Sequence, residues 1–184
     1  MNHHRPTFEI IRTRRVSRFF TNEPVSRGDL LHLIKAARWA SSAGNRRIHK
    51  FVVVDEQKNV KLIRAVSPGI LGNPQALILI CTDKRKAAME GVKMDVDTTT
   101  WIDVGTASQN MMIAAHEIGL GSCPTTSFSK SAVRVILNLP DHLVPEYILQ
   151  VGHPREQARS IGTGEVAKLP VEAITFWGTF PKRD

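Results

Sequence analysis

Four arginines fall within seven residues near the start of the chain: Arg12, Arg14, Arg15 and Arg18. The planar guanidinium group can donate two hydrogen bonds to one phosphate, so this cluster could enclose a phosphate group from several sides. The same cluster could also be a solvated basic surface or a patch that binds nucleic acid. It is the first candidate for chemistry in the chain, and all three interpretations stay open at this point.

A polar loop, Ser41 to Arg47, is the second candidate. The side chain of Asn45 both donates and accepts hydrogen bonds, so it suits a heterocycle that carries mixed polar groups. Arg47 favours a negative charge. An ordinary connecting loop between a helix and a strand is the alternative.

The glycine-rich segment from Gly119 to Pro124 is the third candidate, and we interpret it as a helix C-cap followed by a tight turn. Cys123 has no basic neighbour in sequence, so we expect a small buried residue rather than a nucleophile. The histidines and acidic residues show no metal-ligand spacing, and no nucleophile elbow is present. We therefore expect no metal site and no catalytic side chain, a pattern typical of enzymes whose cofactor carries the chemistry.

Composition narrows the class of protein. The chain has 184 residues and a net charge of +8, while residues 1–64 alone hold 14 basic and 5 acidic side chains, a balance of +9. Its hydrophobic content of 42% argues against disorder. The longest apolar run, 76–81, is too short to cross a membrane, and neither a signal peptide nor a disulfide framework is evident. We expect a cytoplasmic protein with no membrane partner.

The elements that must position the candidate residues follow from hydrophobic periodicity and capping signals. Ser26 and Asp29 form the acidic version of a capping box before a helix. The predicted helices cover residues 8–15, 27–40, 57–66, 103–118 and 129–137. The predicted strands cover residues 51–54, 76–81, 147–151 and 171–176. Residues 84–100 receive no assignment. Strands separated by helices indicate an α+β or α/β layered fold with a mixed sheet.

Four blocks of the chain resemble the FMN-dependent nitroreductase family, in the family's order. They are Ile11–Phe19, Ala40–Arg47, Asp103–Cys123 and Tyr147–Pro154. The third block is similar to the central helix of the family, and the fourth to its late strand with a Gly-x-Pro stop. The resemblance implies an α+β fold, a three-layer α/β/α sandwich around a central mixed β-sheet. It also implies one domain over residues 1–184 and a homodimer with FMN at each interface, where the segment from about 155 to 184 extends onto the partner.

The resemblance also implies which residues bind the cofactor. The first block would hold the phosphate and ribityl end of FMN, and the second would contact the flavin from the other subunit. The stretch after the central helix would lie against the isoalloxazine edge, and a late lysine would reach the phosphate. These residues are Arg14, Arg15, Val16, Arg18, Ser42, Asn45, Arg47, Pro124, Thr125, Thr126 and Lys168. Two of them depart from the family pattern, since Val16 stands in place of Ser and Arg47 in place of Gln.

The function implied by the resemblance is ping-pong hydride transfer from NAD(P)H through FMN to a small-molecule acceptor such as a nitroaromatic or a quinone. Two alternatives remain. The same fold could perform flavin fragmentation, dehalogenation or azoline oxidation. The chain could instead be a basic nucleic-acid-binding protein, which an aromatic content of 6% disfavours, so we expect no nucleic-acid partner.

Overall fold

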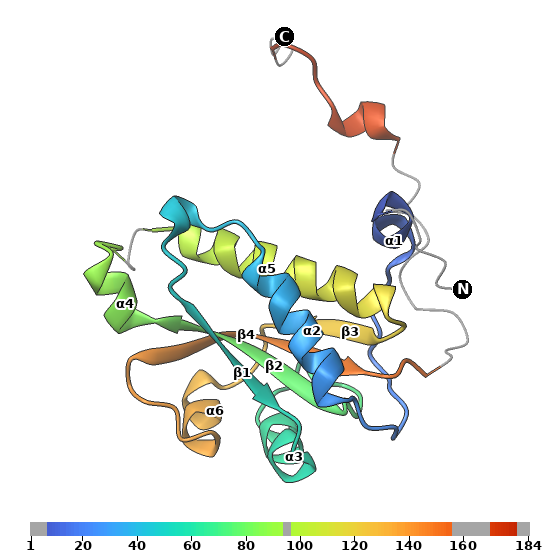
Figure 1. The fold of residues 1–184 in the computed structure, drawn as a ribbon, viewed down its shortest axis with the longest axis vertical. Helices are drawn as coiled ribbons and strands as arrows, with labels where there is room; N and C mark the ends of the chain where they lie inside the picture. Colours follow the sequence, from blue (N-terminus) through green and yellow to red (C-terminus); the bar gives the residue numbers. More distant parts are fainter. Residues whose placement is uncertain (1–6, 94–96, 156–169, 180–184) are drawn as a thin grey trace.

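The computed structural model describes residues 7–93, 97–155 and 170–179. Helices and strands alternate along most of the chain (Figure 1). The elements, in chain order, are α1 (Thr7–Thr13), α2 (Arg27–Arg38), η1 (Ala43–Asn45), β1 (His49–Val54), α3 (Gln57–Ala65), β2 (Ala76–Asp83), α4 (Lys84–Met89), α5 (Thr99–Glu117), β3 (Gly121–Thr125), α6 (Lys130–Ile136), β4 (Leu143–Gly152) and η3 (Val171–Ile174). In these ranges no helix is long and apolar enough to cross a membrane.

The sheet has the strand order β1-β2-β4-β3, and each pair of neighbouring strands is antiparallel. All eight residues of β2 are buried, because this strand lies inside the sheet with a helix layer on each face. A parallel bridge between Val16 and Ser122 adds the segment after α1 to the edge strand β3. This isolated bridge is parallel, whereas the strand pairs of the sheet are all antiparallel.

Two apolar layers separate the sheet from its helices. On one face, Ile78, Ile80 and Leu149 pack with residues of α2 and α5. On the other face, Leu77, Leu79 and Ile148 pack with residues of α3 and α6. This alternation along β2 is the expected consequence of the two-residue strand period. Figure 1 shows the same arrangement of α2 and α5 on one side of the sheet and α3 and α6 on the other. The predicted three-layer α/β/α sandwich is confirmed.

Capping explains where α2 begins and where α5 ends. Ser26 Oγ accepts a hydrogen bond from the backbone N–H of Asp29 (3.0 Å) at the start of α2, as the capping-box pattern predicts. At the end of α5, Gly119 adopts a φ of 82°, a left-handed conformation that glycine adopts without steric cost. The backbone N–H of Leu120 then donates to the carbonyl of Ala115 (2.8 Å), which is the closing bond of a Schellman motif.

Two expectations about the chain were wrong. The tight turn expected after Gly119 is the strand β3, which the sequence hides because glycine and proline are depleted in strands. An edge strand tolerates Pro124, since the missing N–H then faces away from the ladder. The strand expected at 171–176 is instead the short 3-10 helix η3, where the N–H of Ala173 donates to the carbonyl of Pro170 (3.0 Å). Figure 1 shows η3 standing away from the sheet, so it has no strand beside it to pair with.

Candidate functional site

The arginine-rich segment runs alongside the edge strand of the sheet. The N–H of Ser17 donates to the carbonyl of Ser122 on β3 (2.9 Å), and Phe20 forms a bridge with Pro154 just after β4. This close approach requires the glycine at 121, because a Cβ there would lie 2.7 Å from the Cβ of Ser17. The segment is thereby held in an extended conformation at one corner of the molecule.

The three predicted phosphate-binding arginines differ in environment. Arg14 is partly buried, and its Nη1 is a buried donor with no hydrogen-bond partner among the described residues. Arg15 is exposed, and its Nη1 already donates to the carbonyls of Arg12 (2.8 Å) and Arg14 (2.9 Å). Arg18 is exposed and lies near β3, since its charge lowers the pKa of the Cys123 thiol against the larger effect of burial, which raises it.

The predicted stretch 124–126 lies at the same edge of the sheet as the arginines. Pro124 and Thr126 are exposed, whereas the side chain of Thr125 points inward and accepts a hydrogen bond from Gln150 Nε2 (2.6 Å). Pro124 is two residues along β3 from Ser122, or about 7 Å at the usual strand rise. The structure therefore brings the arginine segment and the 124–126 stretch together, and the side chain of Thr125 is directed inward.

The loop that follows α2 is strained and tightly held. Gly44, Asn45 and Arg47 all have positive φ, at 59°, 54° and 49°. Non-glycine residues in this region cost of order 1–3 kcal/mol each and cluster at ligand-binding sites. The loop is fixed to α5 because Asp103 Oδ1 accepts from the N–H of Ala43 (3.0 Å). Arg46 adds an ion pair of 3.3 Å with Asp97.

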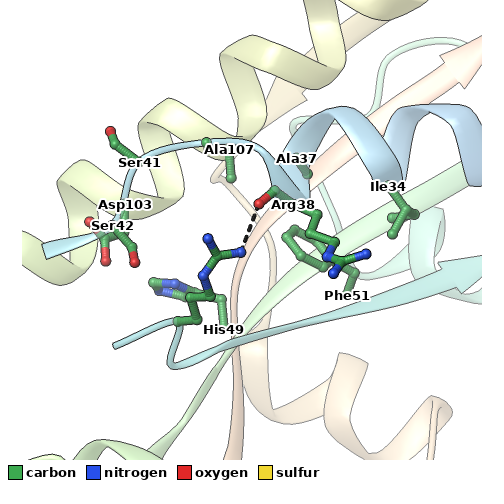
Figure 2. A pocket seen from close by; sticks show the side chains of 11 residues that line it. Ile34, Ala37, Arg38, Ser41, Ser42, His49, Phe51, Asp103 and Ala107 are labelled. Atoms are coloured by element: carbon green, nitrogen blue, oxygen red, sulfur yellow. Dashed lines mark hydrogen bonds between the residues drawn. The ribbon is translucent and has the colours of Figure 1, made fainter. Parts of the chain in front are cut away.

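The side chain of Arg47 turns back onto its own neighbourhood. Its Nε donates to Asn45 Oδ1 (2.8 Å), and its Nη1 donates to the carbonyl of Arg38 at the end of α2 (3.0 Å). The second of these bonds is drawn in Figure 2. Asn45 and Arg47 thus form one hydrogen-bonded unit, which orients both predicted contacts.

A cavity of about 220 Å³ lies behind this loop, between α2, β1 and the first half of α5 (Figure 2). Ser42, Arg47, His49 and Asp103 supply polar groups to its lining. Ser42 Oγ and His49 Nε2 are buried and have no hydrogen-bond partner in the part of the chain that the structure describes. Burial lowers the pKa of His49 more than the nearby carboxylates of Asp103 and Glu146 raise it.

Sequence reasoning missed His49, Asp103 and Arg38 as members of this cavity. A weak signal existed, because Asp103 and Ala107 are one helical turn apart and therefore share a face of α5. The sequence does not show that this face of α5 lies opposite α2 and β1, because only the tertiary fold brings these elements together. Lys168, the remaining predicted residue, lies outside the described residues.

The arginine segment and the 41–47 loop lie at opposite ends of α5. The loop is hydrogen-bonded to Asp103 in the first half of the helix, whereas Thr13 Oγ1 lies 3.0 Å from Nε2 of His116 near its end. Thirteen residues of helix separate these two anchors, which is about 20 Å at 1.5 Å per residue. One chain alone therefore does not bring the predicted phosphate-binding and flavin-contacting residues together.

The comparisons with known proteins agree with this architecture. A protein of Archaeoglobus fulgidus, a candidate NADH dehydrogenase/NAD(P)H nitroreductase, is 30% identical over 156 residues, which cover 81% of this chain and 86% of the relative. An FMN reductase [NAD(P)H] of Bacillus subtilis is 27% identical over 182 residues, which cover 91% of this chain and 71% of the relative.

A solved structure of a nitroreductase family protein from Clostridium difficile superposes with a TM-score of 0.78 at 26% identity, and the match covers 94% of this chain and 98% of that one. The sequence model of the Nitroreductase family matches residues 11–153, which include both candidate regions. The chain therefore belongs to the Nitroreductase family.

Proposed function

We propose that this chain is a cytoplasmic, homodimeric, single-domain FMN-dependent oxidoreductase that passes electrons from NAD(P)H to a nitroaromatic, quinone or similar small acceptor. Family membership and a relative named FMN reductase [NAD(P)H] support the oxidoreductase class, the cofactor and the donor. When bound, FMN would supply the hydride chemistry, which fits a ping-pong sequence in which donor and acceptor use the same site in turn.

The observation that carries the proposal is a match between unsatisfied polar atoms and predicted cofactor contacts. Arg14 Nη1 and Ser42 Oγ are both buried, and neither has a hydrogen-bond partner within residues 7–93, 97–155 and 170–179. A buried donor left unpaired costs about 1–3 kcal/mol, more when it is charged, so such an atom at a candidate site favours a ligand that accepts from it. One of these atoms lies in the proposed phosphate site and the other in the proposed flavin contact, so the residues present fit FMN.

A second copy of the chain would complete the site. Because the two sets of residues lie about 20 Å apart along α5, a two-fold partner could place its Ser42–Arg47 loop beside the arginine segment of the first chain. The outward face of α5 supports this arrangement, since Trp101 and Ile102 are 54% and 61% exposed. Nothing lies within 4 Å of a Cβ built at Gly105 on the same helix, which leaves room for close approach. We place the segment from about 155 to 184 on the partner as well, supported by Trp177, which is 90% exposed.

In this proposal the chain's own residues bind and orient rather than attack. The arginine segment, with Lys168, holds the phosphate and ribityl end, and the exposed backbone around Pro124 and Thr126 faces the ring edge. Ser42, Asn45 and Arg47 of the partner approach from the other side. Cys123 is not a nucleophile, because burial raises the pKa of its thiol and keeps it protonated.

The test is purification of the full chain followed by FMN titration and an anaerobic assay. We expect a dimer by sedimentation, one FMN per chain, and reduction of a nitroaromatic that depends on NADH or NADPH. A chain that takes up no FMN would overturn the proposal as a whole. A chain that binds FMN but does not reduce nitroaromatics or quinones would overturn the acceptor class and point to one of the other reactions on this fold.

A further inference from the structure

The cavity behind the 41–47 loop has the size of one aromatic ring with its substituents. Its walls include the side chains of Ile34, Ala37, Phe51 and Ala107. An apolar cavity of about 150 Å³ is enough to hold benzene, whereas sites for drug-sized ligands usually exceed 300 Å³. At about 220 Å³ the cavity is too small for a tricyclic flavin or a dinucleotide. It adjoins the proposed flavin contact, because Ser42 and Arg47 belong to both.

The two ends of the cavity carry opposite charge. Figure 2 shows Asp103 beside Ser42 at one end, and Arg38 beside Ile34 and Phe51 at the other. Asp103 is 7% exposed, and its Oδ1 accepts from the N–H of Ala43. Its Oδ2 has no hydrogen-bond donor among the described residues. A carboxylate oxygen accepts hydrogen bonds only, so this end favours a ligand group that donates one.

The other end favours an anion. The guanidinium groups of Arg38 and Arg47 both border the cavity, and neither forms an ion pair with a described residue. The Nη2 of Arg47 has no acceptor there, because the two hydrogen bonds of this side chain use Nε and Nη1. A carboxylate between the two arginines would accept charge-assisted hydrogen bonds.

The remaining polar wall is His49, on β1. Burial lowers the pKa of this imidazole, so it is neutral at pH 7 and does not offset the charge of Asp103. Its Nε2 is buried next to the cavity with no partner in the described ranges, and the neutral ring can accept or donate there according to its tautomer. The lining of the cavity thus carries one carboxylate, beside Ser42, and the two arginines Arg38 and Arg47.

We propose that this cavity is a binding site for a single-ring aromatic acid whose para substituent, a hydroxyl or an amine, donates a hydrogen bond. The ring lies between Phe51, Ala37 and Ala107, the carboxylate meets Arg38 and Arg47, and the para group donates to Asp103 Oδ2. This ligand site goes beyond the proposed oxidoreductase function and does not depend on it, because it is defined by binding alone.

Four probes of nearly equal size test the assignment by calorimetry on the full-length protein with the flavin it carries. They are 4-hydroxybenzoate, benzoate, 4-hydroxybenzamide and benzamide, which vary the anion and the donor independently. We expect 4-hydroxybenzoate to bind most tightly, with the carboxylate and the hydroxyl each contributing about tenfold or more in Kd. Absence of saturable binding, or equal affinity for all four probes, would overturn the assignment.

Two variants, one at each end of the cavity, test which ligand group each end binds. Asp103→Asn keeps an oxygen for the N–H of Ala43, and it should remove the advantage of the hydroxyl while preserving that of the carboxylate. Arg38 is exposed, so Arg38→Gln should not disturb the core. This variant should remove the advantage of the carboxylate while preserving that of the hydroxyl. Lys35→Gln, on the same helix and outside the lining, is the matched control and should change neither. Loss of both advantages in either variant, or of one in the control, would contradict the placement of the ligand.

The probes also separate this inference from the proposed function. If the protein takes up no FMN but binds the four probes with the expected order of affinities, the result supports the cavity site and refutes the proposed cofactor. A chain that reduces nitroaromatics and binds none of the four probes refutes the cavity alone.

Discussion

Arg14 and Arg15 are neighbours of the same type, and the structure predicts that they contribute unequally to FMN binding. Arg14 Nη1 is buried and has no partner among the residues that the structure describes, whereas Arg15 Nη1 already donates to two backbone carbonyls from an exposed position. We expect the substitution Arg14→Met to weaken FMN binding strongly and Arg15→Met to weaken it only slightly. The two variants remove the same charge from the same segment, so each is the control for the other.

The expected magnitude follows from the hydrogen bond that Arg14 would make to a phosphate. Hydrogen bonds to charged groups contribute about 1.5–3 kcal/mol, and each 1.4 kcal/mol is tenfold in Kd, so Arg14→Met should raise the Kd for FMN by about 10- to 150-fold. Arg15 would lose mainly a screened surface charge, worth about 0–1 kcal/mol, so its variant should stay within about fivefold.

The stability of the flavin-free protein should change in the opposite direction. Removal of a buried donor that has no partner relieves a desolvation cost, so Arg14→Met should leave the free energy of unfolding unchanged or raise it by about 1 kcal/mol. For a chain of this length, that rise corresponds to an increase of about 2–4 °C in Tm. Loss of binding with preserved or improved stability separates a ligand contact from a structural role.

The assay is fluorescence titration of FMN into the flavin-free protein, with Tm measured by calorimetry on the same samples. Equal Kd values for the two variants would refute the reasoning, since they would show that the buried unpaired donor is no better placed than the exposed one. A large fall in Tm for Arg14→Met without FMN would refute it as well, because it would reveal a structural contact of the guanidinium.

Three further predictions concern the frame of the site. Gly121→Ala should lower the free energy of unfolding by about 1–3 kcal/mol and weaken FMN binding, because the added Cβ would push Ser17 away from β3. An unchanged free energy of unfolding in a denaturant titration would contradict this packing. Burial raises the pKa of Cys81 to about 12 and also raises that of Cys123, so neither thiol should react with iodoacetamide at pH 8 until the chain unfolds. Burial lowers the pKa of His49 below its usual 6.5, so the unfolded state binds a proton more readily than the folded state. Stability should therefore fall as the pH drops below about 6.5. His49→Gln should make Tm less dependent on pH in this range, and an unchanged pH dependence would exclude His49 as its source.

Local signals were sufficient for most helices and for the central strands. The apolar run 76–81 had to be buried on both faces, and β2 is the fully buried strand that results. Ser26 and Gly119 mark helix ends because their side-chain or backbone chemistry satisfies the last unpaired groups of a helix within a few residues. Such interactions are short in sequence, so they can be inferred from it.

The strand β3 depended on contacts that the sequence does not display. Its residues Gly121 and Pro124 disfavour a strand locally, and the strand forms because β4 and the segment around Ser17 flank it. Propensity spans only about 1 kcal/mol in strands, and pairing with neighbours outweighs it.

The sequence by itself determined the family, the layered fold class and the groups of residues that are candidates for cofactor binding. Only the tertiary structure decided which of them are unsatisfied, such as Arg14, and which are already used inward, such as Thr125. It also decided that the arginine segment and the Ser42–Arg47 loop lie at opposite ends of α5, and that Asp103 and Arg38 face one cavity. The physical reason is range: residue type and helical or strand period act over a few positions, whereas burial and pairing of side chains depend on segments that only folding brings together.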